Sequence, residues 1–305
     1  MSERDGVLVV DKTTGPTSHD VVAGVRRVFG LRRVGHCGTL DPLATGVLVV
    51  CLGAYTRLSD WLSRGDKEYE TTLVLGASSD TGDRQGKIQP LTEILPAPEA
   101  AAAALEQFKG LIQQVPPAHS AVKVDGVRSY RLARSQQPVV LEPRQVELKS
   151  IEVLEYAPPR LRLRIRCSRG TYIRSLAIDL GGVLGCGAYV EELRRLRVGA
   201  LHLSQAFTFD QLRELAAGDR LGETLVPIEQ ALGQLPACGL SAAETQVFVH
   251  GGTLSPAGKG TGEGERAVFD GEGRLLGIGR LALGALRPLK VFAPRPCLAE
   301  AGNAR

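Results

Sequence analysis

One twelve-residue stretch of the chain combines residue types that are suited to chemistry. Residues 35–46 hold a histidine, a cysteine, three glycines and an aspartate followed by proline. The aspartate, Asp41, is its only carboxylate, and a carboxylate can act as a nucleophile or as a general acid or base. An Asp before a Pro is usually only a turn residue. The glycines favour a site because they let the backbone approach a ligand closely. These features alone leave both interpretations open.

His36 could serve as a base, a metal ligand or a core histidine. Its neighbour Cys37 does not complete a metal site, because adjacent residues rarely point at one ion. The six cysteines form no C-x-x-C pair and no zinc-ligand spacing, so we expect no metal. Cys51 and Cys167 fall inside apolar strand patterns, where a thiol behaves as a small hydrophobic group. For His36, a ring that stacks on a base or lines a pocket is the better functional interpretation.

Arginines are concentrated in a second candidate region. Arg162, Arg164 and Arg166 alternate with apolar residues over 161–167, which predicts a strand with one covered face and one basic face. Such a face is most often simply solvated. The absence of lysine from it favours phosphate contacts. If this face binds phosphates, replacing the three arginines by Ala is expected to flatten the salt dependence of that binding.

Arg174 and Tyr69 are further candidates. Arg174 falls in the first turn of a predicted helix over 171–184, where a cation is unfavourable unless an anion accompanies it. The anion could be a phosphate or a carboxylate, and a buried Asp–Arg pair would keep the carboxylate ionised. Tyr69 lies in a predicted strand over 67–76, where tyrosine is common for packing alone.

The elements that must position these residues follow from periodicity. A short strand over 6–10 is followed by a helix with one apolar face over 18–29, which Thr17 or Ser18 can cap and Gly30 can end. The run 47–52 predicts a buried strand directly after Asp41. Further strands are predicted over 145–156, 161–168 and 193–203, and a hairpin near Gly126. After an irregular linker at 218–236, short strands alternate with Gly-rich turns.

Composition sets the broad class. The 305 residues suggest one large and one small domain, and 43% hydrophobic content is ample for a core. The net charge of +4 permits a nucleic-acid partner without demanding one. We find no signal peptide and no apolar run near ~18 residues. These features predict a cytoplasmic protein without a membrane function.

At this point the motifs resemble a known family, the bacterial TruB-type tRNA pseudouridine synthases, which modify the T-loop uridine at tRNA position 55. Residues 35–46 are similar to the catalytic loop of that family. The other matching segments occur in family order between about residues 6 and 292: 11–18, 67–69, 79–86, 115–130, 167–176 and 193–199. One departure is Thr13, where the family usually has proline, which affects the rigidity of that turn.

The resemblance implies an α+β pseudouridine-synthase fold. Its large sheet would be mixed, mainly antiparallel and flanked by helices and loops, and a small β-rich, PUA-like domain would follow. The catalytic domain would span residues 1–235, with an RNA-gripping insertion at about 113–137. The PUA-like RNA-binding domain would span 236–294, and 295–305 would be a flexible tail.

The implied reaction detaches uracil from its ribose, rotates it and rejoins it through carbon, which requires no cofactor. Asp41 would be the nucleophile or the acid/base, Arg174 would pair with it and Tyr69 would stack on the flipped base. His36 would fill the gap left in the RNA loop. Whether Asp41 attacks the sugar, attacks the uracil ring or removes a sugar proton stays open. The remaining residues implied to bind substrate or RNA are Lys12, Gly38, Leu40, Asp83, Tyr172, Lys123, Arg162, Arg164 and Arg166.

The implied partner is the T-arm stem-loop of tRNA, with no guide RNA and no membrane, and the protein is expected to be a monomer. Two other classes stay open. One is a non-catalytic RNA-binding or RNA-chaperone protein with the same clamp. The other is a glycoside or nucleoside hydrolase that uses Asp41 with Asp80 or Asp83 as paired carboxylates and releases free uracil. A guide-RNA-dependent relative shares the motifs, but the set found here suits a stand-alone enzyme.

Overall fold

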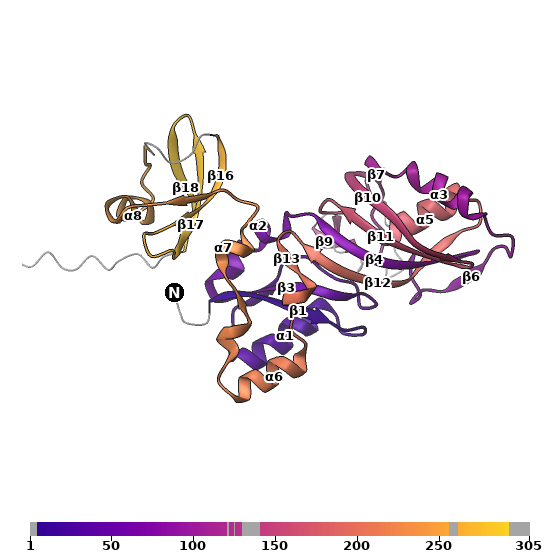
Figure 1. Cartoon of the computed structure of the whole chain (residues 1–305), viewed down its shortest axis with the longest axis horizontal. Helices are drawn as coiled ribbons and strands as arrows, with labels where there is room; N and C mark the ends of the chain where they lie inside the picture. Colours follow the sequence, from indigo (N-terminus) through magenta and orange to yellow (C-terminus); the bar gives the residue numbers. More distant parts are fainter. Residues whose placement is uncertain (1–4, 121, 125, 130–140, 256–261, 293–305) are drawn as a thin grey trace, which may run out of the picture.

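A ten-stranded sheet forms the centre of the computed structural model, which describes residues 5–120, 122–124, 126–129, 141–255 and 262–292 (Figure 1). The strand order is β14-β1-β3-β12-β4-β11-β10-β7, with β2 paired to β3 and β13 paired to β12. Among the described pairs of this sheet, only β3 with β12 is parallel. The prediction of a mixed, mainly antiparallel sheet is confirmed. Its strands are β1 (Gly6–Lys12), β2 (Val34–His36), β3 (Thr45–Leu52), β4 (Lys67–Leu75), β7 (Gly110–Gln114), β10 (Arg144–Ala157), β11 (Arg160–Cys167), β12 (Ala188–Val198), β13 (Leu201–His202) and β14 (Leu225–Val226).

The helix α1 (Ser18–Phe29) forms as predicted, for local reasons. Thr17 caps it by accepting a hydrogen bond from the backbone N–H of Asp20, whose carboxylate accepts from the N–H of Thr17 in return. Gly30 ends it in the left-handed region at φ 63°. Its apolar residues, including Val25 and Phe29, are buried in the main core.

Other helices cover the sheet or connect its strands. The helix α5 (Ile173–Val183) carries Arg174 in its first turn and buries Leu176 and Leu180. The remaining helical segments are η1 (Gly53–Leu58), α2 (Ser59–Ser63), α3 (Pro98–Glu106), η2 (Leu203–Gln205), α6 (Phe209–Ala217), η3 (Leu221–Thr224), α7 (Ile228–Ala231) and α8 (Ala242–Val249). None of the helices in the described ranges has the length and apolarity needed to cross a membrane.

Within the described ranges, two small hairpins lie outside the large sheet. One pairs β5 (Ala77–Ser79) with β6 (Ile88–Pro90) and frames the acidic loop. The other pairs β8 (Lys123–Val124) with β9 (Val127–Arg128) around Gly126, which confirms the predicted hairpin. Residues 130–137 of the predicted insertion lie outside the described ranges.

A second sheet is built entirely from the end of the chain. It contains β15 (Ala237–Gly239), β16 (Gly264–Phe269), β17 (Leu275–Ala282) and β18 (Ala285–Val291), and lies at one end of the molecule beside α7 and α2 (Figure 1). One buried cluster joins the two parts, since Phe269 and Ile278 belong to the same cluster as Leu58. Trp61 Nε1 also donates to Glu265 Oε2 at 2.8 Å. The predicted β-rich end of the chain is therefore confirmed.

Gly46 shows how tightly the loop that carries Asp41 is joined to the sheet. It has φ of +93°, and a Cβ atom there would lie 2.2 Å from the carbonyl oxygen of Arg195 in β12. Gly46→Ala is therefore expected to lower the free energy of unfolding by at least about 2 kcal/mol, because strain and a backbone clash add. Urea unfolding measures the loss. Gly110→Ala is the matched control: Gly110 has φ of +92° and nothing within 4 Å of its Cβ position. Equal losses for both variants would contradict the account.

Candidate active site

Asp41 and Arg174 meet although 133 residues separate them in the chain. Asp41 lies between β2 and β3, and Arg174 Nε donates to Asp41 Oδ2 at 2.8 Å. The arginine side chain is 4% exposed and the aspartate side chain 30% exposed. The anion expected beside Arg174 is thus the carboxylate of Asp41. The exposed part of this carboxylate lines a cavity.

Arg174 also ties two other segments to the Asp41 loop. Its Nη1 donates to Thr81 O at 3.0 Å and its Nη2 to His119 O at 2.8 Å. Asp83 Oδ2 lies 3.6 Å from its Nε, so two carboxylates share one guanidinium. The buried Asp83 accepts hydrogen bonds from Thr81 Oγ1 and from the N–H of Gln85. Of the two carboxylates, Asp83 is the buried one and Asp41 is the more exposed one.

Two cavities meet at Asp41. The inner cavity, of about 210 Å³, reaches from Asp41 to Tyr69 and Tyr172 and has Leu193 in its wall. The outer cavity, of about 430 Å³, is lined by the His19, Gln85 and His119 side of the site. Asp41, Arg174, Leu40, Thr39 and Ser120 line both. The Asp41 carboxylate therefore adjoins both cavities.

Tyr69 and Tyr172 provide the aromatic surface of the inner cavity. Tyr69 comes from β4 and is 6% exposed, and burial raises its pKa to about 12. Its phenol is therefore protonated at neutral pH. Burial also raises the pKa of Tyr172, whose backbone is fixed by two hydrogen bonds with the Gln114 side chain. Both tyrosines thus line the cavity that Asp41 also lines.

His36 lies at the margin of the site. It does not line either cavity among the described residues. Its ring packs edge-to-face on the ring of His19 with centroids 5.4 Å apart, and His19 lines the outer cavity. The backbone of Leu40 is pinned by Ser18, whose hydroxyl accepts from Leu40 N–H and donates to Leu40 O. Lys123 contributes its backbone to β8, and its side chain lies outside the description.

The structure assigns Lys12 a different position from the RNA contact that the sequence predicts. Its side chain is buried, and its Nζ donates to Thr13 O at 3.0 Å, Pro42 O at 3.2 Å and Ala44 O at 2.6 Å. All three donor directions of the ammonium group are used by backbone carbonyls. Lys12 therefore holds the Asp41 loop from within, and this occupancy argues against a contact with RNA.

The pKa of Lys12 predicts how stability changes with pH. Burial lowers that pKa to about 8 in the folded protein, against an ordinary value of 10.5. Between these values the unfolded chain binds more protons at this position, so the free energy of unfolding that Lys12 contributes rises with pH. Lys12→Met is expected to remove roughly 2 kcal/mol of this rise between about pH 7.5 and 10. Urea unfolding at the two pH values measures it, and identical pH slopes in both proteins would contradict it.

The arginine stripe, formed by Arg162, Arg164 and Arg166, lies on the side of the sheet away from Asp41. Arg164 pairs in register with Glu70, whereas Ile165 pairs with Tyr69, and neighbouring strand residues point to opposite faces. The reverse face, defined by Arg162, Arg164, Arg166 and Glu70, therefore faces away from Asp41. Glu70 binds Arg162 at 3.0 Å and Arg164 at 2.7 Å, and Asp66 binds Arg166 at 3.1 Å. This placement argues against the predicted RNA contact of the stripe.

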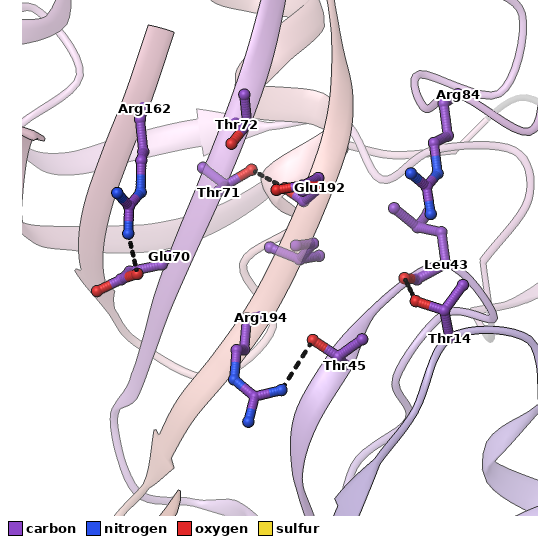
Figure 2. Close-up of a pocket in the computed structure, with 11 residues that line it drawn as sticks. Thr14, Leu43, Thr45, Glu70, Thr71, Thr72, Arg84, Arg162, Glu192 and Arg194 are labelled. Carbon is purple, nitrogen blue, oxygen red and sulfur yellow. Dashed lines mark hydrogen bonds and ion pairs between the residues drawn. The ribbon is translucent and has the colours of Figure 1, made fainter. Parts of the chain in front are cut away.

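A separate polar cavity of about 420 Å³ opens on the reverse face (Figure 2). Figure 2 shows Arg162 bound to Glu70 on one side of the cavity, and Arg84 and Thr14 on the other. Arg194, bound to Thr45, lies between them. Three arginines line it, Arg84, Arg162 and Arg194, together with two glutamates, Glu70 and Glu192. The charges of this cavity are nearly balanced, unlike those of a phosphate-binding surface.

Two buried cations of the site escape the sequence patterns. Arg195 is 1% exposed and Lys67 is 7% exposed, and both line the inner cavity. Burial lowers the pKa of Lys67 to about 8. A signal exists in the sequence, because each lies two residues from a residue that lines this cavity: Lys67 from Tyr69, and Arg195 from Leu193. This signal is easily overlooked, because charged residues are normally expected at the surface.

Two family models together match residues 26–233 of the chain. Residues 26–173 match the family model described as TruB family pseudouridylate synthase (N terminal domain). Residues 174–233 match the tRNA pseudouridylate synthase B C-terminal domain. A protein of Thermobifida fusca named tRNA pseudouridine synthase B is 44% identical over 299 residues, covering 95% of this chain and 99% of the relative. One of the same name from Dechloromonas aromatica is 42% identical over 283 residues, covering 92% and 93%.

Solved structures extend the comparison to the fold. A chain in the structure of an H/ACA RNP bound to a substrate RNA containing 2'-deoxyuridine superimposes with a TM-score of 0.75 at 26% identity, covering 95% of this chain and 86% of that one. A chain of the archaeal box H/ACA sRNP Nop10-Cbf5 complex gives 0.73 at 26% identity, covering 95% and 87%. The predicted pseudouridine-synthase fold is confirmed. By the family models and by relatives above 40% identity over most of its length, the chain belongs to the TruB family of pseudouridylate synthases, which are isomerases.

Proposed function

We propose that this protein converts the T-loop uridine of tRNA into pseudouridine, with Asp41 as the reactive carboxylate. The observation that carries the proposal is the partly exposed Asp41 carboxylate, bound to the buried Arg174 where two cavities meet. The inner cavity would take the flipped uracil. The outer cavity would take the adjoining nucleotides of the loop.

The reaction needs no partner beyond the RNA. The C1′–N1 bond breaks, the uracil turns within the inner cavity, and C5 joins C1′ while the C5 proton is lost and N1 gains one. Asp41 would supply the carboxylate that either attacks or transfers a proton. Tyr69 would stack on the base, which returns roughly 1–3 kcal/mol against a flipping cost of a few kcal/mol. Because the phenol of Tyr69 is protonated at neutral pH, it would donate a hydrogen bond rather than take up a proton.

Several of the predicted RNA contacts fit this proposal. Tyr172, Gly38 and Leu40 line the inner cavity. His36 would act through its contact with His19 at the mouth of the outer cavity. The hairpin β8–β9 would grip the T-arm from one side. We propose that the second sheet is a PUA-like module, with the catalytic domain ending near residue 235, and that the protein acts as a cytoplasmic monomer.

The test is an unmodified tRNA transcript carrying 5-tritiated uridine, incubated with the purified protein alone. Tritium release without free uracil is expected. Free uracil would indicate a nucleoside hydrolase. Binding without tritium release would indicate an RNA-binding or chaperone protein. Release that requires an added guide RNA would place the chain with guide-dependent enzymes.

The reverse face supplies a prediction that runs against the sequence pattern. Replacing Arg162 and Arg164 by Ala is expected to leave the salt dependence of tRNA binding unchanged, because both are paired with Glu70 on the side away from Asp41. Filter binding at several salt concentrations gives the slope. If the slope of log affinity against log salt concentration falls by about one for each arginine removed, these arginines contact phosphates as the sequence predicts.

A further inference from the structure

Arg195 is a fully buried cation in the wall of the inner cavity. It is 1% exposed and belongs to the largest of the fully buried side chains. Carrying a charge into a protein interior costs several kcal/mol unless hydrogen bonds compensate it. Backbone carbonyls provide that compensation here: its Nε donates to Val47 O at 2.8 Å, Nη1 to Thr39 O at 3.3 Å and Nη2 to Gly38 O at 3.1 Å.

These three carbonyls flank Asp41 on both sides. Gly38 and Thr39 precede it, and Val47 is in β3 directly after the loop. Lys12 binds the intervening carbonyls of Pro42 and Ala44. Lys12 and Arg195 thus hold the backbone of residues 38–47, while Arg174 holds the Asp41 carboxylate itself.

Arg195 is also the cross-strand neighbour of Tyr69. The two residues are directly paired in register between β12 and β4, where Cβ atoms lie about 4.5–5.5 Å apart. A guanidinium has five N–H groups, and the carbonyls use three of them. Its charge and hydrogen bonding lower the pKa of Tyr69 against the larger effect of burial. The register and the shared cavity thus place the guanidinium and the phenol side by side on one face of the sheet.

We infer that Arg195 is a positioning residue of this site: one guanidinium fixes the backbone on both sides of Asp41 and lies beside Tyr69, and so sets the carboxylate and the ring relative to each other across the inner cavity. The inference rests on the proposed function. A displacement of about 1 Å between a catalytic group and its substrate can cost about 100-fold in rate. Removing Arg195 should therefore affect the chemical step far more than RNA binding.

Arg194 offers a matched control in the same strand. It is the preceding residue, it points to the reverse face, and it binds Asp11 Oδ2 at 2.8 Å and Thr45 Oγ1 at 3.3 Å. Arg194→Met removes the same chemical group one position away without touching the inner cavity. Its expected single-turnover rate of tritium release is within threefold of wild type.

The experiment compares single-turnover rates and tRNA dissociation constants for wild type, Arg195→Met, Arg195→Lys and Arg194→Met, with folding checked by circular dichroism. Arg195→Met is expected to lose about 100-fold or more in rate with a dissociation constant within threefold of wild type. Arg195→Lys keeps the buried charge but not the fork of donors. It should therefore recover part of the rate, and a tenfold or larger remaining deficit is expected.

A folded Arg195→Met protein with a rate within threefold of wild type would overturn the inference. If Arg195→Met does not fold, the Arg195→Lys protein, which retains the charge, is used in its place. An Arg195→Lys rate within threefold of wild type would then overturn the inference. A parallel loss in Arg194→Met would also overturn it, because the effect would then belong to the strand and not to the cavity. Absence of turnover in wild type would instead reject the proposed function, so the two failures are distinguishable.

Discussion

Asp41→Asn is expected to lower the single-turnover rate of pseudouridine formation by at least about 10⁴-fold. The amide has the shape of the carboxylate but neither its charge nor its ability to attack or to take up a proton. Arg174 Nε, which donates to Asp41 Oδ2 at 2.8 Å, can still donate to the amide oxygen. The fold and the tRNA dissociation constant should therefore stay close to wild type. Tritium release with enzyme in excess measures the rate, and filter binding measures the affinity.

Asp80→Asn is the control for this variant. Asp80 lies in the neighbouring loop, is exposed, and accepts a hydrogen bond from Lys87 N–H through Oδ1, which an amide oxygen can still accept. Its rate should match wild type. An Asp41→Asn protein that retains a rate within tenfold of wild type would remove Asp41 from the reaction.

Arg174→Met is expected to have the second largest effect, on both rate and stability. The change removes the donors to Asp41, Thr81 O and His119 O. It also leaves Asp83, whose side chain is 6% exposed, without the cation beside it. Breaking a buried ion pair in this way costs about 3–5 kcal/mol. Loss of the geometry around Asp41 should lower the rate by about 10²-fold or more. Urea unfolding and single-turnover tritium release measure the two quantities.

Two comparisons separate these causes. Arg169→Met, in the same segment, removes an exposed arginine that lies 3.7 Å from Asp60, and it should change neither quantity appreciably. Adding Asp83→Asn to Arg174→Met removes the uncompensated carboxylate, so part of the stability should return while the rate stays low. An Arg174→Met protein as stable as wild type would show that Asp83 does not depend on this cation.

Local structure could be predicted well from the sequence where short-range physics decides it. The capping box at Thr17 and Asp20 and the left-handed Gly30 mark the ends of α1. Alternation over 161–167 predicts β11 with its apolar side covered, and every apolar position of that strand is buried. The strands of the second sheet are similarly marked by Gly-rich turns.

The assembly of the site could not be predicted from local patterns. Asp41, Tyr69 and Arg174 come from three distant segments, and only the family resemblance linked them before the structure showed Asp41 and Tyr69 lining one cavity with Arg174. Alternation shows that Arg162 and Arg164 share a face, but the register with β4 decides which face that is. Hydrophobic patterns also do not predict that Lys12 and Arg195 are buried. Backbone carbonyls compensate their charges, and no residue type in the sequence marks where such carbonyls lie.

Mapping the modified nucleotide tests the central claim most directly. An unmodified tRNA transcript is treated with the purified wild-type protein or with Asp41→Asn, and pseudouridine is located by carbodiimide adducts that stop primer extension. The account predicts one stop, at the T-loop uridine, with wild type and none with Asp41→Asn. A stop at another uridine, no stop with wild type, or the same stop with Asp41→Asn would contradict it.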